Sequence, residues 1–145
     1  MNKILKLIIL IHFSYICSTA ALSKENFFEE ALKMYQDEKY DDARFLFERN
    51  IVFNPKDAVS YLYLAKIYNH KEDQRNELNN LETALLIEPD NEEVILMLMK
   101  IALKKSNYSK VKNLSKTFLK VCERLCDENN EIQTSLKNIE SKNGS

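Results

Sequence analysis

Two prolines set the period of this chain. Pro55 and Pro89 are the only prolines among the 145 residues, and they stand 34 positions apart. Each lies in a similar polar run, Asn-Pro-Lys-Asp at 54–57 and Glu-Pro-Asp-Asn at 88–91. A proline ends the preceding helix because its ring clashes with the turn before it. A constant period of this length, closed by a proline, predicts stacked helical hairpins.

The scarcity of glycine and the balance of charge exclude several classes of protein. Gly144 is the only glycine, which argues against β-hairpins and against a phosphate-binding glycine-rich loop. It also predicts that no folded residue adopts a positive φ. The formal net charge is −1, from 21 basic and 22 acidic residues, so no overall field attracts nucleic acid. We therefore expect an all-α protein without a nucleic-acid partner.

The first twenty residues have the three-part layout of a secretory signal. Lys3 and Lys6 form a short basic region, residues 7–17 are almost wholly apolar, and residues 18–21 are small. This order is typical of a signal peptide that is removed from the mature protein. The sequence thus predicts that residues 1–20 are a signal peptide and that the protein is periplasmic or secreted.

Other interpretations of the N-terminal segment stay open. Cleavage fits after Ala20 or after Ala21. An uncleaved segment would instead anchor the protein in a membrane through residues 4–17, although that stretch is short for a full span. A lipid attached to Cys17 and a buried N-terminal helix are two further alternatives. A membrane is a partner only if the segment is retained.

Three consecutive 34-residue frames carry a recurring pattern. The frame 58–91 reads Tyr61-x2-Leu64-Ala65-x2-Tyr68, followed by Leu81, Ala84 and Pro89. The frame 24–57 supplies Phe27, Ala31, Tyr40, Ala43-x3-Phe47 and Pro55, and the frame 92–125 is weaker and has no closing proline. This pattern resembles the tetratricopeptide repeat (TPR), a unit of two antiparallel helices.

The resemblance implies an α-solenoid of about three antiparallel helix hairpins plus a C-terminal capping helix. The TPR-like domain would span 21–140. Ile132, Leu136 and Ile139 recur at helical spacing and predict the cap helix at 128–140, with a disordered tail at 141–145. The expected helices are 24–38, 41–54, 57–70, 74–88, 91–105, 108–124 and 128–140.

Small residues mark where the two helices of a hairpin cross. An alanine lets two backbones approach closely, so we expect the four alanines of the first two frames to be buried: Ala31, Ala43, Ala65 and Ala84. Glu77 departs from this pattern, because it occupies the place of a small residue. Either that crossing is wider, or the stem of Glu77 lies along the surface with its carboxylate in water. Asp41, Asp57 and the pair Asp90–Asn91 stand where helix N-caps are expected.

The resemblance also implies a binding groove lined by the first helix of each hairpin. The nine groove positions are Phe28, Leu32, Tyr35, Leu62, Lys66, Asn69, Leu96, Lys100 and Leu103. In this family, the clamp that binds chaperone C-termini needs a lysine at the fifth place of a frame and an asparagine at the ninth. This chain has neither, so we do not expect it to carry that clamp. An apolar floor with two lysines suits a peptide that carries apolar anchors and an acidic group. Alternatively, these side chains simply pack between adjacent first helices.

The sequence offers few candidate catalytic residues. His70 is the only histidine beyond the apolar N-terminal segment, and a lone histidine is typical of a surface residue. Cys122 and Cys126 are four residues apart. Within a continuous helix their Cα atoms would be close enough for a disulfide, but their Cα–Cβ bonds would not converge as a disulfide requires. They form a partly packed thiol pair, or a disulfide if the helix ends between them. We expect no catalytic residue, cofactor or metal site, and hence no enzyme.

These observations favour a non-catalytic scaffold of the bacterial cell envelope that binds a protein or peptide partner in the groove. One alternative is a membrane-anchored subunit of a larger envelope assembly. Another is a thiol- or metal-dependent protein that uses Cys122 and Cys126. The sequence identifies neither the partner nor the oligomeric state.

Overall fold

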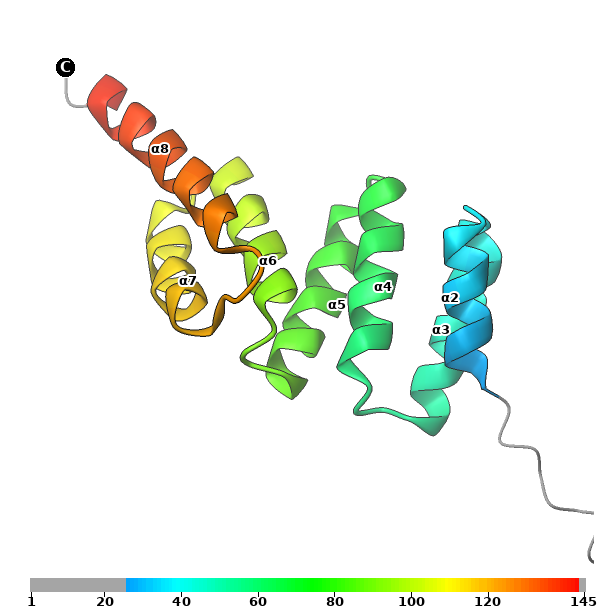
Figure 1. The fold of residues 1–145 in the computed structure, drawn as a ribbon. Helices are drawn as coiled ribbons and strands as arrows, with labels where there is room; N and C mark the ends of the chain where they lie inside the picture. Colours follow the sequence, from blue (N-terminus) through cyan, green and yellow to red (C-terminus); the bar gives the residue numbers. More distant parts are fainter. Residues whose placement is uncertain (1–25, 144–145) are drawn as a thin grey trace, which may run out of the picture.

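The computed structural model describes residues 26–143, and the predicted signal peptide lies outside the described residues. Within this range the chain forms seven α-helices and no strand (Figure 1). Every predicted helix bound lies within three residues of the observed one, and the predicted all-α solenoid is confirmed. The helices are α2 (Phe27–Gln36), α3 (Tyr40–Phe53), α4 (Ala58–His70), α5 (Gln74–Ile87), α6 (Glu92–Lys104), α7 (Tyr108–Val121) and α8 (Cys126–Asn143).

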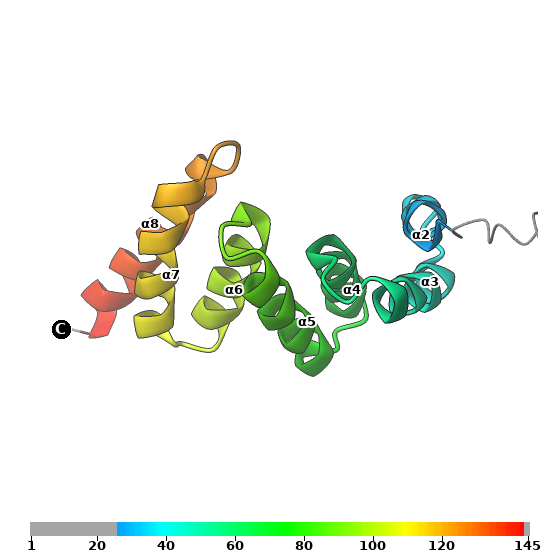
Figure 2. The ribbon, with the colours of Figure 1, turned by 90° about the horizontal axis from the view of Figure 1, so that it is seen from below.

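The helices pair into three successive hairpins, α2–α3, α4–α5 and α6–α7, with α8 following the last. Seen from below in Figure 2, the helices follow one another along a curved row. We call α2, α4 and α6 the first helices and α3, α5 and α7 the second helices. α8 continues through Asn143, so residues 141–143 are helical and do not belong to a disordered tail as predicted.

The turn inside each hairpin is a Schellman motif that repeats at the 34-residue period. Glu38, Glu72 and Ser106 have φ of 59°, 58° and 55°. In each case the residue after it donates its backbone N–H to a carbonyl five positions back, as Lys39 does to Met34 at 2.9 Å. The prediction that no folded residue adopts positive φ is therefore wrong. Three non-glycine residues do so, because the motif satisfies carbonyls that the helix end would leave unpaired.

Side-chain caps begin most of the helices. Asp73 accepts a hydrogen bond from Asn76 N at 3.1 Å, and Asn91 accepts one from Val94 N at 3.1 Å. The predicted cap Asp41 is wrong, since it lies inside the first turn of α3 and Lys39 holds the cap position without a side-chain bond. Asp57 does occupy the N-cap of α4, but its carboxylate is used elsewhere.

The four predicted crossing alanines are fully buried, which confirms that the helices approach at these positions. The middle hairpin and the start of the third share one apolar cluster that includes Leu62, Leu81 and Leu98. A second cluster joins α6 and α7 to Ile132 and Leu136 of α8. The last helix thus covers apolar surface that the third hairpin would otherwise expose, as an array end requires.

No helix within residues 26–143 combines the length and apolar character that crossing a bilayer demands.

Candidate functional site

The nine predicted groove residues divide into a buried set and a more accessible set. Leu62 and Leu96 are only 5% exposed and belong to the apolar clusters. They therefore pack between helices and do not form an open floor. Lys66 and four apolar or aromatic residues are half-buried, while Asn69 and Lys100 are exposed. The half-buried residues are Phe28, Leu32, Tyr35, Lys66 and Leu103.

Both groove lysines have partners within the protein. Lys66 of α4 pairs with Glu93 of α6 at 2.7 Å, and Lys100 of α6 pairs with Glu128 of α8 at 2.8 Å. Each lysine thus bridges to the next helix on the same side of the array. The anion that we expected a partner to bring is already supplied by the protein. Partly exposed pairs of this kind contribute little to stability on their own.

Tyr63 organises the first-helix side of the N-terminal half, although the sequence did not single it out. Its ring stacks on Phe47 with centroids 5.1 Å apart, and it meets the edge of Tyr35 at 4.9 Å. The ammonium group of Lys66 lies 4.7 Å from the centroid of the same ring. Tyr63 thus connects α2, α3 and α4. Its position midway along a first helix, among other aromatic residues, was the only available signal.

Glu77 is buried and lines a polar pocket. The residue is 4% exposed, and Nδ2 of Asn69 donates a hydrogen bond of 2.8 Å to its Oε1. Glu77 and Asn69 line a pocket of about 340 Å³ together with Glu72, Gln74, Ile101 and Lys104. The interpretation that placed the carboxylate of Glu77 in water is wrong, because the residue is only 4% exposed.

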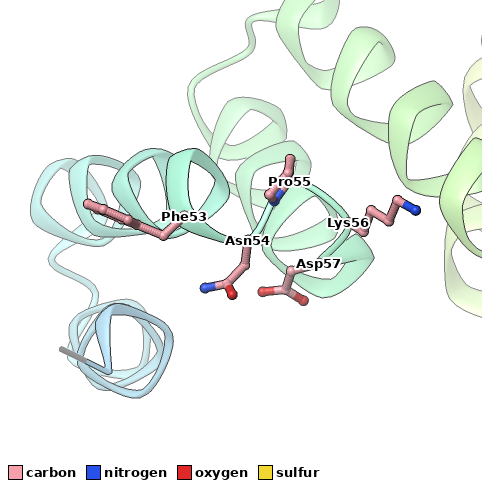
Figure 3. A pocket seen from close by; sticks show the side chains of 5 residues that line it. All are labelled: Phe53, Asn54, Pro55, Lys56 and Asp57. Carbon is pink, nitrogen blue, oxygen red and sulfur yellow. The ribbon is translucent and has the colours of Figure 1, made fainter. Parts of the chain in front are cut away.

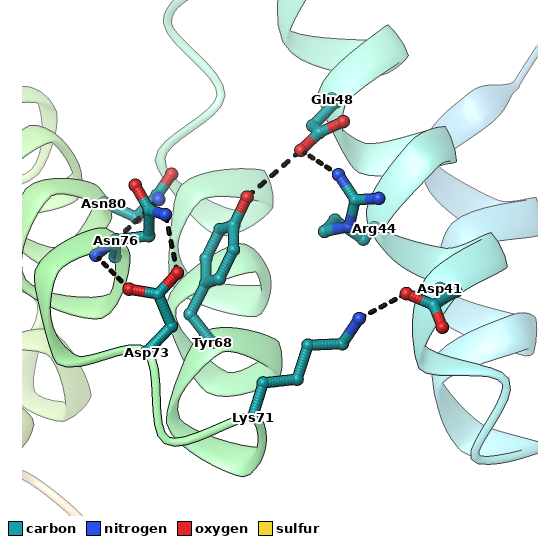
Figure 4. A network of polar contacts seen from close by, with 8 residues as sticks. All are labelled: Asp41, Arg44, Glu48, Tyr68, Lys71, Asp73, Asn76 and Asn80. Atoms are coloured by element: carbon teal, nitrogen blue, oxygen red, sulfur yellow. Dashed lines mark hydrogen bonds and ion pairs between the residues drawn. The ribbon is translucent and has the colours of Figure 1, made fainter.

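A polar network joins the first two hairpins on another side of the array (Figure 4). Glu48 of α3 accepts hydrogen bonds from Arg44 at 2.8 Å and from Tyr68 of α4 at 3.2 Å. Lys71 pairs with Asp41, and the hydrogen bond from this ammonium group lowers the pKa of Asp41. Burial, followed by the charge of Glu48, raises the pKa of Tyr68. The network ties α3 to α4 and is structural in character.

The α3–α4 connection contains a second buried polar cluster. Nδ2 of Asn50 donates to Asp57 at 2.6 Å and to Ser60 at 2.8 Å, while Ser60 donates to Asp57 at 2.7 Å. Beside it lies an open depression (Figure 3), in which the side chains of Phe53 and Lys56 point in opposite directions. None of the predicted groove residues lines this depression.

A disulfide closes the connection between α7 and α8. Cys122 and Cys126 are bonded, with their Cα atoms 5.3 Å apart, because α7 ends at Val121 and α8 begins at Cys126. The sequence left open a pair of free thiols or a disulfide at these positions, and the structure contains the disulfide. The helix break between the two cysteines makes this geometry accessible.

The carboxylate of Glu92 occupies the disulfide-closed turn. Its Oε2 accepts backbone hydrogen bonds from Glu123 at 2.8 Å, Arg124 at 3.1 Å and Leu125 at 3.3 Å. Arg124 Nε adds a contact of 3.2 Å to Oε1. These donors, that of Glu123 first, lower the pKa of Glu92 to about 2. Glu123 stands where a third proline would continue the 34-residue period.

Within residues 26–143, His70 and the two cysteines belong to no candidate metal site. The imidazole of His70 packs on Tyr40 with ring centroids 4.3 Å apart. Residues 26–143 contain no group of three or more His, Cys, Asp or Glu side chains that could hold a metal ion.

Solved structures share this arrangement of helices. The type III secretion chaperone SycD of Yersinia enterocolitica, in complex with a peptide of the translocator YopD, has a TM-score of 0.69 and 14% identity, covering 86% of this chain and 98% of its own. PcrH, in complex with the chaperone-binding region of PopD, has a TM-score of 0.67 and 14% identity, covering 85% and 97%. The TPR domain of Sgt2 from Aspergillus fumigatus has a TM-score of 0.67 and 13% identity, covering 86% and 84%.

At the level of sequence, no family model and no curated protein matches the chain. Identities of 13–14% carry information about the fold alone. The hairpins, their 34-residue period and these structural neighbours agree, and the chain has a TPR-like helical-repeat fold.

Proposed function

We propose that this protein is a non-catalytic scaffold of the cell envelope that holds a segment of a partner protein against its first helices. The observation that carries the proposal is the row formed by α2, α4 and α6, whose half-buried apolar residues Tyr35, Leu32 and Leu103 remain accessible for contact. Arrays of stacked hairpins present an extended surface of this kind. Two proteins with the same fold were crystallised with a segment of a partner, which supports the analogy.

The proposed location rests on the N-terminal segment and on the disulfide. A signal at residues 1–20 would deliver the chain to an oxidising compartment, where a bond between Cys122 and Cys126 persists. N-terminal sequencing of the protein from its native cells tests this part. A mature chain that begins at residue 21 or 22 supports secretion, whereas an intact N-terminus supports the anchored alternative.

Site-specific photo-crosslinking in the native cells tests the binding surface. A photoreactive amino acid at Tyr35 or Leu103 should capture the same partner, because both positions lie on the first helices. Matched controls at Phe45 and Leu86 place the same group on exposed apolar positions of second helices, 58% and 82% exposed. Capture from the controls alone would place the partner on the opposite surface. Capture from none of the four positions would contradict the scaffold proposal.

A further inference from the structure

Glu77 breaks the pattern of the residues that share its place in the repeat. The equivalent positions in the first and third hairpins are Ala43 and Val111, and both are fully buried and apolar. An apolar side chain such as alanine or valine can pack at this position, so the repeat itself does not require a charged residue there. Glu77 is just as deeply placed, so its carboxylate loses most of its hydration. Burying a carboxylate is costly unless a cation or several donors compensate it.

The described residues compensate Glu77 only in part. Its Oε1 takes one hydrogen bond from the neutral amide of Asn69, and no lysine or arginine of residues 26–143 forms an ion pair with it. Its second oxygen, Oε2, accepts no hydrogen bond within the described chain, yet it is not sealed inside the protein. Glu77 lines the pocket, so an accessible oxygen without a donor can accept a hydrogen bond from a group that enters there.

The charge around the pocket favours a cation. Glu72 and Glu77 contribute two carboxylates to its lining, against the single ammonium group of Lys104. Neither Glu72 nor Lys104 forms an ion pair within the described range, and both are exposed at the rim. Ile101 adds an apolar wall along which the methylene stem of a long side chain can lie.

The two groove lysines do not repel a cation that approaches the pocket, because Glu93 neutralises Lys66 and Glu128 neutralises Lys100. Asn69, which connects the pocket to the predicted groove, is itself one of the groove positions. A partner segment lying along the first helices would therefore pass the mouth of the pocket.

We infer that the pocket between the second and third hairpins receives the ammonium or guanidinium group of a lysine or arginine carried by the partner segment. The inference rests on the proposed function and specifies the partner's chemistry. The incoming cation donates to Oε2 of Glu77, and the carboxylate of Glu72, which lines the same pocket, adds to the negative charge that attracts it. The partner is thus selected for a basic residue beside its apolar anchors, in contrast to the acidic group expected from the sequence.

A displayed library of random peptides, selected on the full-length chain, tests the inference. Peptides recovered on the wild-type protein should carry Lys or Arg at a constant spacing from apolar residues. The variant Glu77→Gln keeps an acceptor for Asn69 but removes the charge, and it should weaken these peptides about tenfold or more. The matched control Glu82→Gln removes an exposed carboxylate from the same helix, 52% exposed, and should leave binding unchanged.

Two further measurements make the result decisive. Replacing the basic residue of a selected peptide by methionine should cost affinity on the wild type but little on Glu77→Gln, as a double-mutant cycle requires for a direct contact. Thermal unfolding should show Glu77→Gln at least as stable as the wild type, which separates lost binding from lost folding. Selected peptides without a basic residue, or additive effects in the cycle, would overturn the inference alone. Recovery of no peptide would overturn the proposed function as well.

Discussion

Hairpin α2–α3 is held together by aromatic rings, whereas hairpin α6–α7 is held by aliphatic side chains, a disulfide and a helix laid against it. In the first, Phe28 of α2 meets Phe47 of α3 with ring centroids 5.9 Å apart, and Tyr63 of the neighbouring α4 contacts both rings, at 6.5 Å and 5.1 Å. In the third, Ile132 and Leu136 of α8 complete a cluster with the apolar residues of α6 and α7. The two hairpins follow the same repeat pattern but solve the packing problem with different residues.

The two hairpins also differ in how much of their apolar surface is covered within residues 26–143. Phe53 and Val52 remain exposed on α3, at 64% and 74%, and Phe53 stacks on Phe27 at 5.6 Å. The third hairpin has its apolar surface covered by α8. A helical array needs a cap over the apolar face of its last repeat. At the C-terminal end the cap is the helix α8, which an apolar cluster and the disulfide join to the last hairpin.

The largest effect is expected from opening the C-terminal cap. Leu136→Ala removes a buried side chain that is 2% exposed, and it should lower the free energy of unfolding by about 2–5 kcal/mol. The control Leu119→Ala removes the same atoms from a position that is 59% exposed, and should change stability by about 0.5 kcal/mol at most. Urea unfolding followed by circular dichroism measures both. Equal losses would mean that α8 does not cap the array.

The disulfide should contribute the next largest effect. Replacing Cys122 and Cys126 by serine frees a loop whose ends are four residues apart, and a loop of this length corresponds to about 2 kcal/mol. Hydrogen exchange should rise in α8 and at the end of α7, while α2 and α3 keep their protection. An equal loss of amide protection in all helices would show that the two ends of the array do not unfold independently.

Acid should weaken the C-terminal turn before it affects the first hairpin. The pKa of Glu92 is lowered from 4.5 to about 2, so its carboxylate stabilises the fold above pH 4.5. That contribution declines as the pH falls from 4.5 toward 2. Glu92→Gln should therefore unfold at a lower temperature than the wild type at pH 7, with the gap closing toward pH 2. A gap that is independent of pH would exclude the carboxylate as its source.

The smallest effect, a gain, is expected at the start of α3. Asp73 and Asn107 cap α5 and α7 through their side chains, but Lys39 at the equivalent place makes no such bond. Lys39→Asn should supply the cap and stabilise the first hairpin by about 1 kcal/mol. Thermal unfolding measures the change. Asn107→Lys is the reciprocal control, with a loss of similar size expected in the third hairpin.

Most of the fold could be predicted from periodicity. The spacing of Pro55 and Pro89 placed two inter-hairpin turns, and the alanines at 31, 43, 65 and 84 placed the crossings. The Schellman turns at Glu38, Glu72 and Ser106 could not be found by searching for glycine, because other residues hold the left-handed conformation. Their 34-residue spacing is itself a signal, although it becomes visible only once the frame is known.

The candidate site was predicted less well than the fold. Lys66 and Lys100 were placed on first helices, but their neutralisation by Glu93 and Glu128 depends on residues 27 and 28 positions away. Such contacts follow from how one hairpin docks on the next. Likewise, Leu62 and Leu96 fit the pattern of a groove, and only their surroundings show that they are buried.

The sequence by itself determined the repeat, the helix bounds and the apolar crossings, because these depend on residues close together in the chain and on a period of 34. The tertiary structure alone decided which charges are paired, that Glu92 binds the turn after α7, and that the buried Glu77 lines a pocket and accepts a hydrogen bond from Asn69. Each of these depends on the distance between groups from different helices. Helical periodicity fixes the face on which a residue lies, but only the docking of the helices fixes what it meets there.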